Sequence, residues 1–168
     1  MRDRERRRDD DIRPAAIAVQ DELRTAARER TLPQYANKDP QTLTRELESI
    51  GRDRFRPIPA DAFETLRRYC LQGDPLKWVV TTNGEILFGP THHTHAALAG
   101  GEPVLAAGHA YLVEIDRQRK QFFITSINNT SGHYQPAEPS IDIAIRLLRA
   151  HGFTVPDAAK QPHSTLFS

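Results

Sequence analysis

Histidine is the residue whose type and spacing in this 168-residue chain could do chemistry. Five of the seven histidines fall between residues 92 and 133, in two stretches that cover 89–95 and 127–136 together with the intervening His109. An imidazole exchanges protons readily near neutral pH, which suits it to act as a general acid or base. We therefore expect any catalytic chemistry of the chain to reside in these two stretches.

The first stretch, Gly89 to His95, follows a predicted strand, where a rigid scaffold displays loop residues. His95 is its strongest candidate for a general acid or base. The alternative is that His95 begins and caps a short helix while His92 and His93 face solvent. Imidazoles at 93 and 95 could also converge with His109 or His133 on Zn²⁺, but the sequence has no His-Glu-x-x-His pair and no thiolate pair. We therefore predict no metal site.

The second stretch, 127–136, leaves a predicted strand and is rich in turn-forming polar residues. Gly132 permits a turn that would direct His133 and Tyr134 outward as catalytic residues. Amide and hydroxyl groups nearby could stabilise a developing negative charge. The predicted substrate-binding residues are Asn128, Asn129, Ser131 and His109. The alternative is a turn in which the Asn and Ser side chains bond the backbone and Tyr134 packs on a closing helix.

The sequence supports neither covalent catalysis nor a phosphate-binding glycine loop. Ser131 and His133 are only two residues apart, and no G-x-S-x-G elbow surrounds the serine. Cys70, the single cysteine, lies in a predicted helix without a histidine neighbour and can form no disulfide within the chain. Gly100-Gly101 is followed by Glu-Pro, so no phosphate-binding glycine loop of the common types is present.

Charge and hydropathy exclude further classes. Lys and Arg number 23 against 22 Asp and Glu, so the net charge of +1 provides no overall field toward nucleic acid or anionic lipid. Any nucleic-acid contact must therefore be a local patch. No apolar run is long enough to span a membrane, and the N-terminus has no apolar segment of a secretory signal. We expect a soluble protein, either cytoplasmic or exported by a route without a cleaved signal.

Four regions follow from the patterning. Residues 1–13 alternate Arg with acids and predict a disordered leader, and 157–168 predict an irregular tail. Region 14–74 has helical spacing, with helices beginning near Pro14, Pro40 and Asp61. From residue 75 to 156 the period shortens toward 2, and Asn83-Gly84 predicts a tight hairpin.

The expected fold is therefore α+β. N-terminal helices precede an antiparallel meander of four or five strands, and a C-terminal helix over 140–150 closes the domain.

The sequence INNTSGHYQP at 127–136, followed by an amphipathic helix, resembles a motif of the C-terminal domains of bacterial polymorphic toxins and secreted effectors. Upstream, HAAL at 95–98 leads into GEPVLAAG at 101–108, which is similar to a Gly-x-Pro-Val-x-x-Ala-Gly run of the same domains. The resemblance covers about residues 76–153. Its pattern has an acidic residue after Ala-Gly, where this chain has His109. This departure implies an exchanged base or impaired activity.

The resemblance implies an enzyme domain that damages or modifies a target in another cell. As a metal-independent ribonuclease it would use His95 and His133 as base and acid, with Tyr134, Asn128 or Lys120 on the phosphate. As an ADP-ribosyltransferase it would hold NAD as its substrate through His95 or Tyr134. The Arg, Ser-Thr-Ser and Glu-x-Glu residues of such transferases are missing from the sequence, which favours the ribonuclease. No other cofactor is expected.

Two non-catalytic classes stay open. A binding module would display Trp78, Tyr111, Phe122 and the histidine loops to a protein partner, and an immunity-like protein would use the fold only structurally. The expected partners are a nucleic-acid or nucleotide substrate for the enzyme, and an immunity protein or a parent chain.

Overall fold

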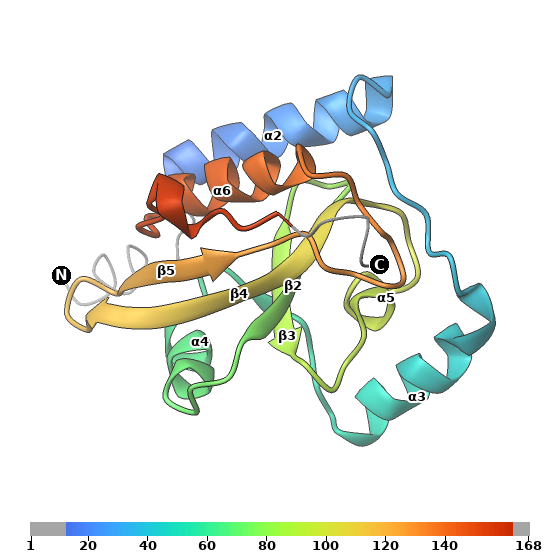
Figure 1. The fold of residues 1–168 in the computed structure, drawn as a ribbon, viewed down its shortest axis with the longest axis horizontal. Helices are drawn as coiled ribbons and strands as arrows, with labels where there is room; N and C mark the ends of the chain where they lie inside the picture. The colour runs from blue at the N-terminus through green and yellow to red at the C-terminus, as the bar shows by residue number, and fades with distance from the viewer. Residues whose placement is uncertain (1–12, 163–168) are drawn as a thin grey trace, which may run out of the picture.

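The computed structural model describes residues 13–162, so the predicted leader apart from Arg13, and the last six residues of the tail, lie outside the described part. Figure 1 shows the helices and strands coloured in chain order. The helical segments are α2 (Pro14–Glu29), η1 (Pro40–Thr42), α3 (Leu43–Arg52), α4 (Phe63–Cys70), α5 (His95–Leu98), α6 (Ser140–Ala150) and η2 (Asp157–Ala159). The strands are β1 (Ile58–Pro59), β2 (Leu76–Thr81), β3 (Ile86–Pro90), β4 (Val104–Asp116) and β5 (Gln121–Ile127).

The five strands form one sheet in the order β1-β3-β2-β4-β5, and every pairing is antiparallel. The α+β class, the antiparallel sheet and the closing helix are thereby confirmed. The predicted hairpin turns at Asn83-Gly84, where Gly84 has a φ of 80°. Chain order would place β3 between β2 and β4. Instead β4 pairs with β2, so β3 lies on the other side of β2. This pairing sets Lys77 directly between Gly89 and His109.

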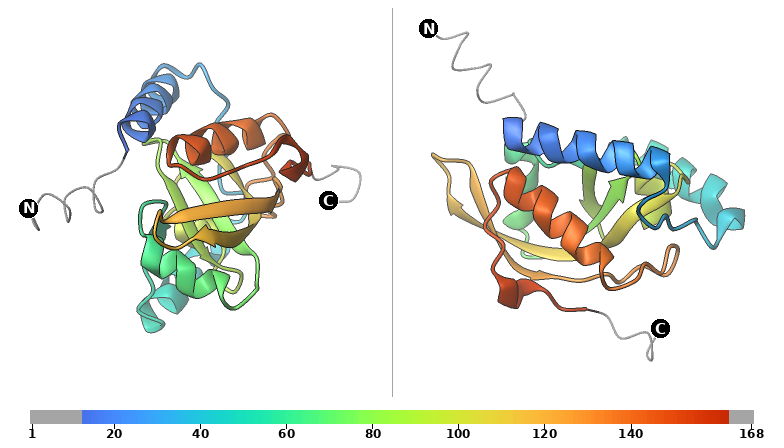
Figure 2. Two further views of the ribbon diagram at one scale, coloured as in Figure 1. Left: turned by 90° about the vertical axis from the view of Figure 1, so that its left-hand side faces the viewer. Right: turned by 90° about the horizontal axis from the view of Figure 1, so that it is seen from above.

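Helices α2 and α6 lie side by side (Figures 1 and 2). Helix α4 packs in the same main core as these two helices, whereas Leu43 of α3 packs against the smaller cluster around α5. The main core joins the sheet to three of these helices. It includes Trp78, Leu23, Leu66 and Leu148, each at most 4% exposed. A smaller apolar cluster involves α5 and comprises Val79, Ala96, Leu98, Val104, Ala107 and Tyr134.

The predicted helical region 14–74 is not packed separately. Leu23 of α2 and Leu66 of α4 are in the same core as the sheet, and β1 supplies an edge strand from within that region. Asp39 makes no side-chain cap, and the 3-10 turn η1 leads into α3 instead. Within residues 13–162 no helix combines the length and the apolar character that crossing a bilayer requires.

Candidate active site

A carboxylate that the sequence patterns did not single out organises the site. Glu46 lies in the first turn of α3, and its Oε1 is 2.8 Å from His133 Nε2. Two hydroxyls also donate to it, Thr94 to Oε2 at 2.6 Å and Thr42 to Oε1. Burial raises the pKa of Glu46, but these hydrogen bonds outweigh it and hold the pKa below its usual value. Glu46 is therefore an ionised acceptor that fixes the His133 ring.

His133 combines a fixed orientation with access to solvent. Its side chain is 20% exposed, whereas that of Glu46 is 11% exposed. A carboxylate bonded to one imidazole nitrogen fixes the ring and its tautomer, as the aspartate does in the hydrolase triads. The pair therefore has the arrangement of an oriented general base or acid.

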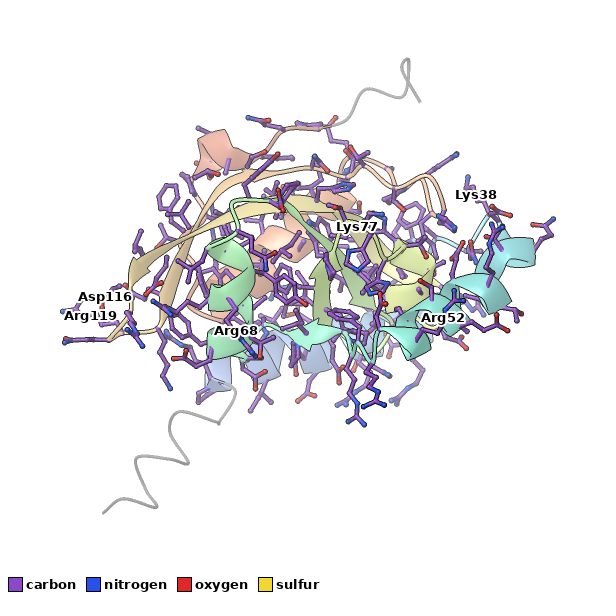
Figure 3. The ribbon with its side chains drawn as sticks, turned by 90° about the horizontal axis from the view of Figure 1, so that it is seen from below. Lys38, Arg52, Arg68, Lys77, Asp116 and Arg119 are labelled. Atoms are coloured by element: carbon purple, nitrogen blue, oxygen red, sulfur yellow. The ribbon has the colours of Figure 1, made fainter. Side chains whose placement is uncertain are left out.

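Lys77 brings a cation to the same place. It is half-buried in β2, and within residues 13–162 its ammonium makes no hydrogen bond or ion pair. Burial lowers the pKa of Lys77, and the negative charge of Glu46 partly opposes this. In the view from below in Figure 3, Lys77 lies toward the middle of the molecule, and Lys38 and Arg52 lie to one side of it. A half-buried cation that forms no ion pair is suited to receive an anionic group.

His109 is the cross-strand neighbour of Lys77 and belongs to the same cluster. Burial lowers the pKa of His109, the charge of Lys77 lowers it further, and hydrogen bonding with Thr130 and Asn128 opposes both. Its ring lies edge-on to that of His95, with centroids 5.3 Å apart. Half-buried beside Lys77, His109 is available to exchange a proton at the site.

His95 is buried and bonds the backbone next to His109. It begins α5 after Thr94, whose hydroxyl caps the helix by accepting from the Ala97 amide. The ring is 3% exposed, and its Nε2 donates to the carbonyl of Gly108 at 2.7 Å. Burial lowers the pKa of His95 to about 3, so the ring is neutral at physiological pH. This placement matches the alternative only in that His95 begins a helix, because Thr94 caps that helix and His93 is buried rather than facing solvent. Burial also keeps the His95 ring from solvent.

The loop after β5 is held by its own polar side chains. Asn128 Oδ1 accepts from the amides of His109 and Thr130, each at 3.0 Å, and the Asn129 amide donates to the Pro136 carbonyl. The Ser131 hydroxyl accepts from the Tyr134 amide at 3.3 Å. These contacts match the alternative turn, in which the Asn and Ser side chains bond the backbone, so these side chains shape the loop that presents His133.

Tyr134 is directed away from the site. Its side chain is fully buried in the smaller apolar cluster, and its hydroxyl donates to the Glu102 carbonyl at 2.8 Å. Burial raises the pKa of the Tyr134 phenol, so it stays protonated. Of the predicted catalytic residues, the structure thus places His133 at a solvent-accessible position and the rings of His95 and Tyr134 in the interior.

Sequence reasoning missed Glu46 and Lys77. A lysine between Leu76 and Trp78, in an otherwise apolar strand, was the available signal for Lys77. Glu46 had no such signal, because α3 carries several charged residues and only tertiary packing distinguishes this one. Lys120, which the resemblance placed on the phosphate, lies in the turn between β4 and β5, at the opposite end of β5 from His133.

A second polar cluster lies beside the first. Asp53 Oδ2 is 3.4 Å from His92 Nε2 and 3.3 Å from His93 Nε2, and the His93 ring stacks on Phe55. A pocket of about 280 Å³ opens between α3 and the loop before α5. Residues of both clusters line it: Arg45, Glu46, Ser49, Arg52, His92, His93 and Thr94.

Comparisons with known proteins give no relative. No family model matches the chain, and the searches of curated proteins and of solved structures return no match either. The resemblance to toxin domains therefore stays a prediction, and function must be argued from the site itself.

Proposed function

We propose that this chain is a toxin- or effector-type enzyme that cleaves RNA by metal-independent acid–base catalysis. The observation that carries the proposal is the Glu46–His133 pair, set beside Lys77 and His109. Two imidazoles and an ammonium are the groups that phosphodiester cleavage by an internal hydroxyl needs, namely a base, an acid and a partner for the phosphate.

His133, oriented by Glu46, takes the proton of the ribose 2′-hydroxyl. The 2′-oxygen attacks phosphorus, and the bond from phosphorus to the 5′-oxygen breaks. His109 in its protonated form gives its proton to that leaving oxygen. The products are a 2′,3′-cyclic phosphate and a 5′-hydroxyl, and no external reactant is consumed. Lys77 stabilises the charge that builds on the phosphate oxygens.

His95 is a positioning residue in this scheme. Its ring bonds the Gly108 carbonyl and so fixes β4 immediately before His109. The backbones of Gly108 and Asn128 approach each other closely, because a Cβ on Gly108 would lie 1.8 Å from the carbonyl oxygen of Asn128. Asn128 holds the backbone of His109 from the other side. His109 and the loop after β5 are thus fixed relative to each other.

The alternatives receive less support from the structure. A binding module would display Trp78 and Phe122, but these are 0% and 2% exposed, and only Tyr111 of the three is on the surface. For an NAD-dependent transferase, Glu46 is the carboxylate at the site, and its oxygens already accept from Thr42, Thr94 and His133. It is therefore poorly placed to hold a nicotinamide ribose.

The test is incubation of the full chain with a 5′-labelled RNA of mixed sequence in the presence of EDTA. We expect fragments ending in 2′,3′-cyclic phosphate from the wild type and from Glu48→Gln, an exposed position on the same helix as Glu46. His133→Ala and Glu46→Gln should lose most of this activity while keeping a folded thermal transition. Absence of cleavage by the wild type, or equal cleavage by His133→Ala, would refute the proposal.

A further inference from the structure

The cluster of Asp53, His92 and His93 takes no part in the proposed reaction. Asp53 caps the C-terminal end of α3, and the two histidines lie in the loop between β3 and α5. Their three ligand atoms all lie within 4.8 Å of one another. The cluster therefore links the helix that carries Glu46 to the loop that carries Thr94.

The two distances from Asp53 to the histidine nitrogens match those between metal ligands. Two ligand atoms that are each about 2.0–2.1 Å from a tetrahedral ion lie roughly 3.3 Å from each other. The two distances from Asp53 Oδ2 to the histidine nitrogens are 3.4 and 3.3 Å. Both exceed the roughly 2.7–2.9 Å of a charge-assisted hydrogen bond. The carboxylate thus lies at a coordinating distance from both rings, and neither ring is hydrogen-bonded to it.

A buried nitrogen provides the second observation. The His93 side chain is 1% exposed, and its Nε2 has no hydrogen-bond partner within the described residues. A buried imidazole nitrogen without a partner is costly unless something else binds it. This nitrogen points at the Asp53 carboxylate and the His92 ring, whose centroid is 4.2 Å from that of His93.

We propose that Asp53, His92 and His93 bind one divalent transition-metal ion of the Zn²⁺ class, although the sequence predicted no metal site. Two imidazoles and a carboxylate fill three positions and leave the rest to water. Both histidines line the pocket beside α3, which gives the ion a route of entry. The ion fastens α3 to the β3–α5 loop, and no proton transfer of the proposed RNA cleavage depends on it.

Chelator-stripped protein titrated with ZnCl₂ tests the site by calorimetry and by thermal unfolding. We expect one ion per chain and a thermal midpoint that rises with free Zn²⁺, because the ion binds only the folded chain. Asp53→Asn and His92→Ala should each weaken binding at least tenfold. Both positions are well exposed, so these variants should stay folded. Asp74→Asn, an exposed aspartate outside the cluster, should bind like the wild type.

Two results would overturn the assignment. The first is a wild type that shows neither heat of binding nor a shift of the midpoint. The second is binding that survives in His92→Ala and Asp53→Asn but is lost in His133→Ala, since the ion would then sit at the Glu46–His133 cluster. Neither result depends on RNA cleavage, so the metal site and the proposed activity are tested separately.

Discussion

Glu46 Oε1 and His133 Nε2 lie 2.8 Å apart although 87 positions separate the two residues in the chain. The bond connects α3 to the loop that follows β5, so the site exists only when the helix is docked on the sheet. Thr42 and Thr94 fix the same carboxylate from two other segments. Formation of the site is thus coupled to tertiary packing.

A double-mutant cycle on this pair should be strongly non-additive. If Glu46 acts only by orienting His133, Glu46→Gln and His133→Ala should each lower kcat, and the double variant should be no slower than His133→Ala. Loss of a general acid or base costs roughly 10²–10⁴-fold. The measurement is kcat for RNA cleavage by the four proteins. Independent, multiplying losses would contradict an orienting role.

Lys77→Met should separate activity from stability. The substitution removes a half-buried cation that forms no ion pair, so we expect an unchanged or raised thermal midpoint. Cleavage should fall roughly 10²–10³-fold in kcat/KM, the range for losing a group that stabilises the transition-state charge. Lys77→Arg keeps the charge and should retain part of the activity. A fall in midpoint with unchanged kcat/KM would show that Lys77 is only structural.

Acid should destabilise the protein through His95. The folded state depresses the pKa of this ring from 6.5 to about 3, so the unfolded chain takes up its proton first as the pH falls. The stabilisation is complete above pH 6.5 and is lost as the pH falls toward 3. Its slope is at most about 1.4 kcal/mol per pH unit.

His95→Gln isolates this contribution, because the amide can still donate to Gly108 and does not titrate. Urea unfolding between pH 7 and pH 5 should show a shallower loss of free energy in the variant than in the wild type. Parallel curves would mean that folding does not lower the pKa of His95.

Tyr134→Phe should leave catalysis intact. The phenol lies in the apolar cluster and donates to the Glu102 carbonyl, so the variant loses one buried hydrogen bond and no group of the site. We expect the free energy of unfolding to fall by about 0.5–1.5 kcal/mol. Denaturant unfolding and kcat together check this. A loss of activity that exceeds the loss of folded protein would restore Tyr134 as a catalytic residue.

Local patterns predicted the elements but not their arrangement. Asn83-Gly84 marked the hairpin and the helical spacing after Pro40 marked α3, because turns and amphipathic helices depend on near neighbours in sequence. The pairing of β4 with β2 depends on packing between distant segments. Sequence periodicity carries no such information.

The same limit applies to the site. The histidines of the two stretches lie close together, and the charges of His109 and His133 both act on the pKa of His95. Residue type alone could not show that His95 is buried, or that Tyr134 turns inward while its neighbour His133 stays accessible. Glu46 and Lys77 became candidates only through their distances and burial.

The central claim is that the 2′-hydroxyl attacks under the action of His133. An all-DNA oligonucleotide and the same oligonucleotide with a single ribonucleotide test it most directly. With EDTA present, the wild type should cut the second only, immediately 3′ of the ribonucleotide, and His133→Ala should cut neither. Cutting of the all-DNA strand, or a cut that leaves a 5′-phosphate, would contradict the account.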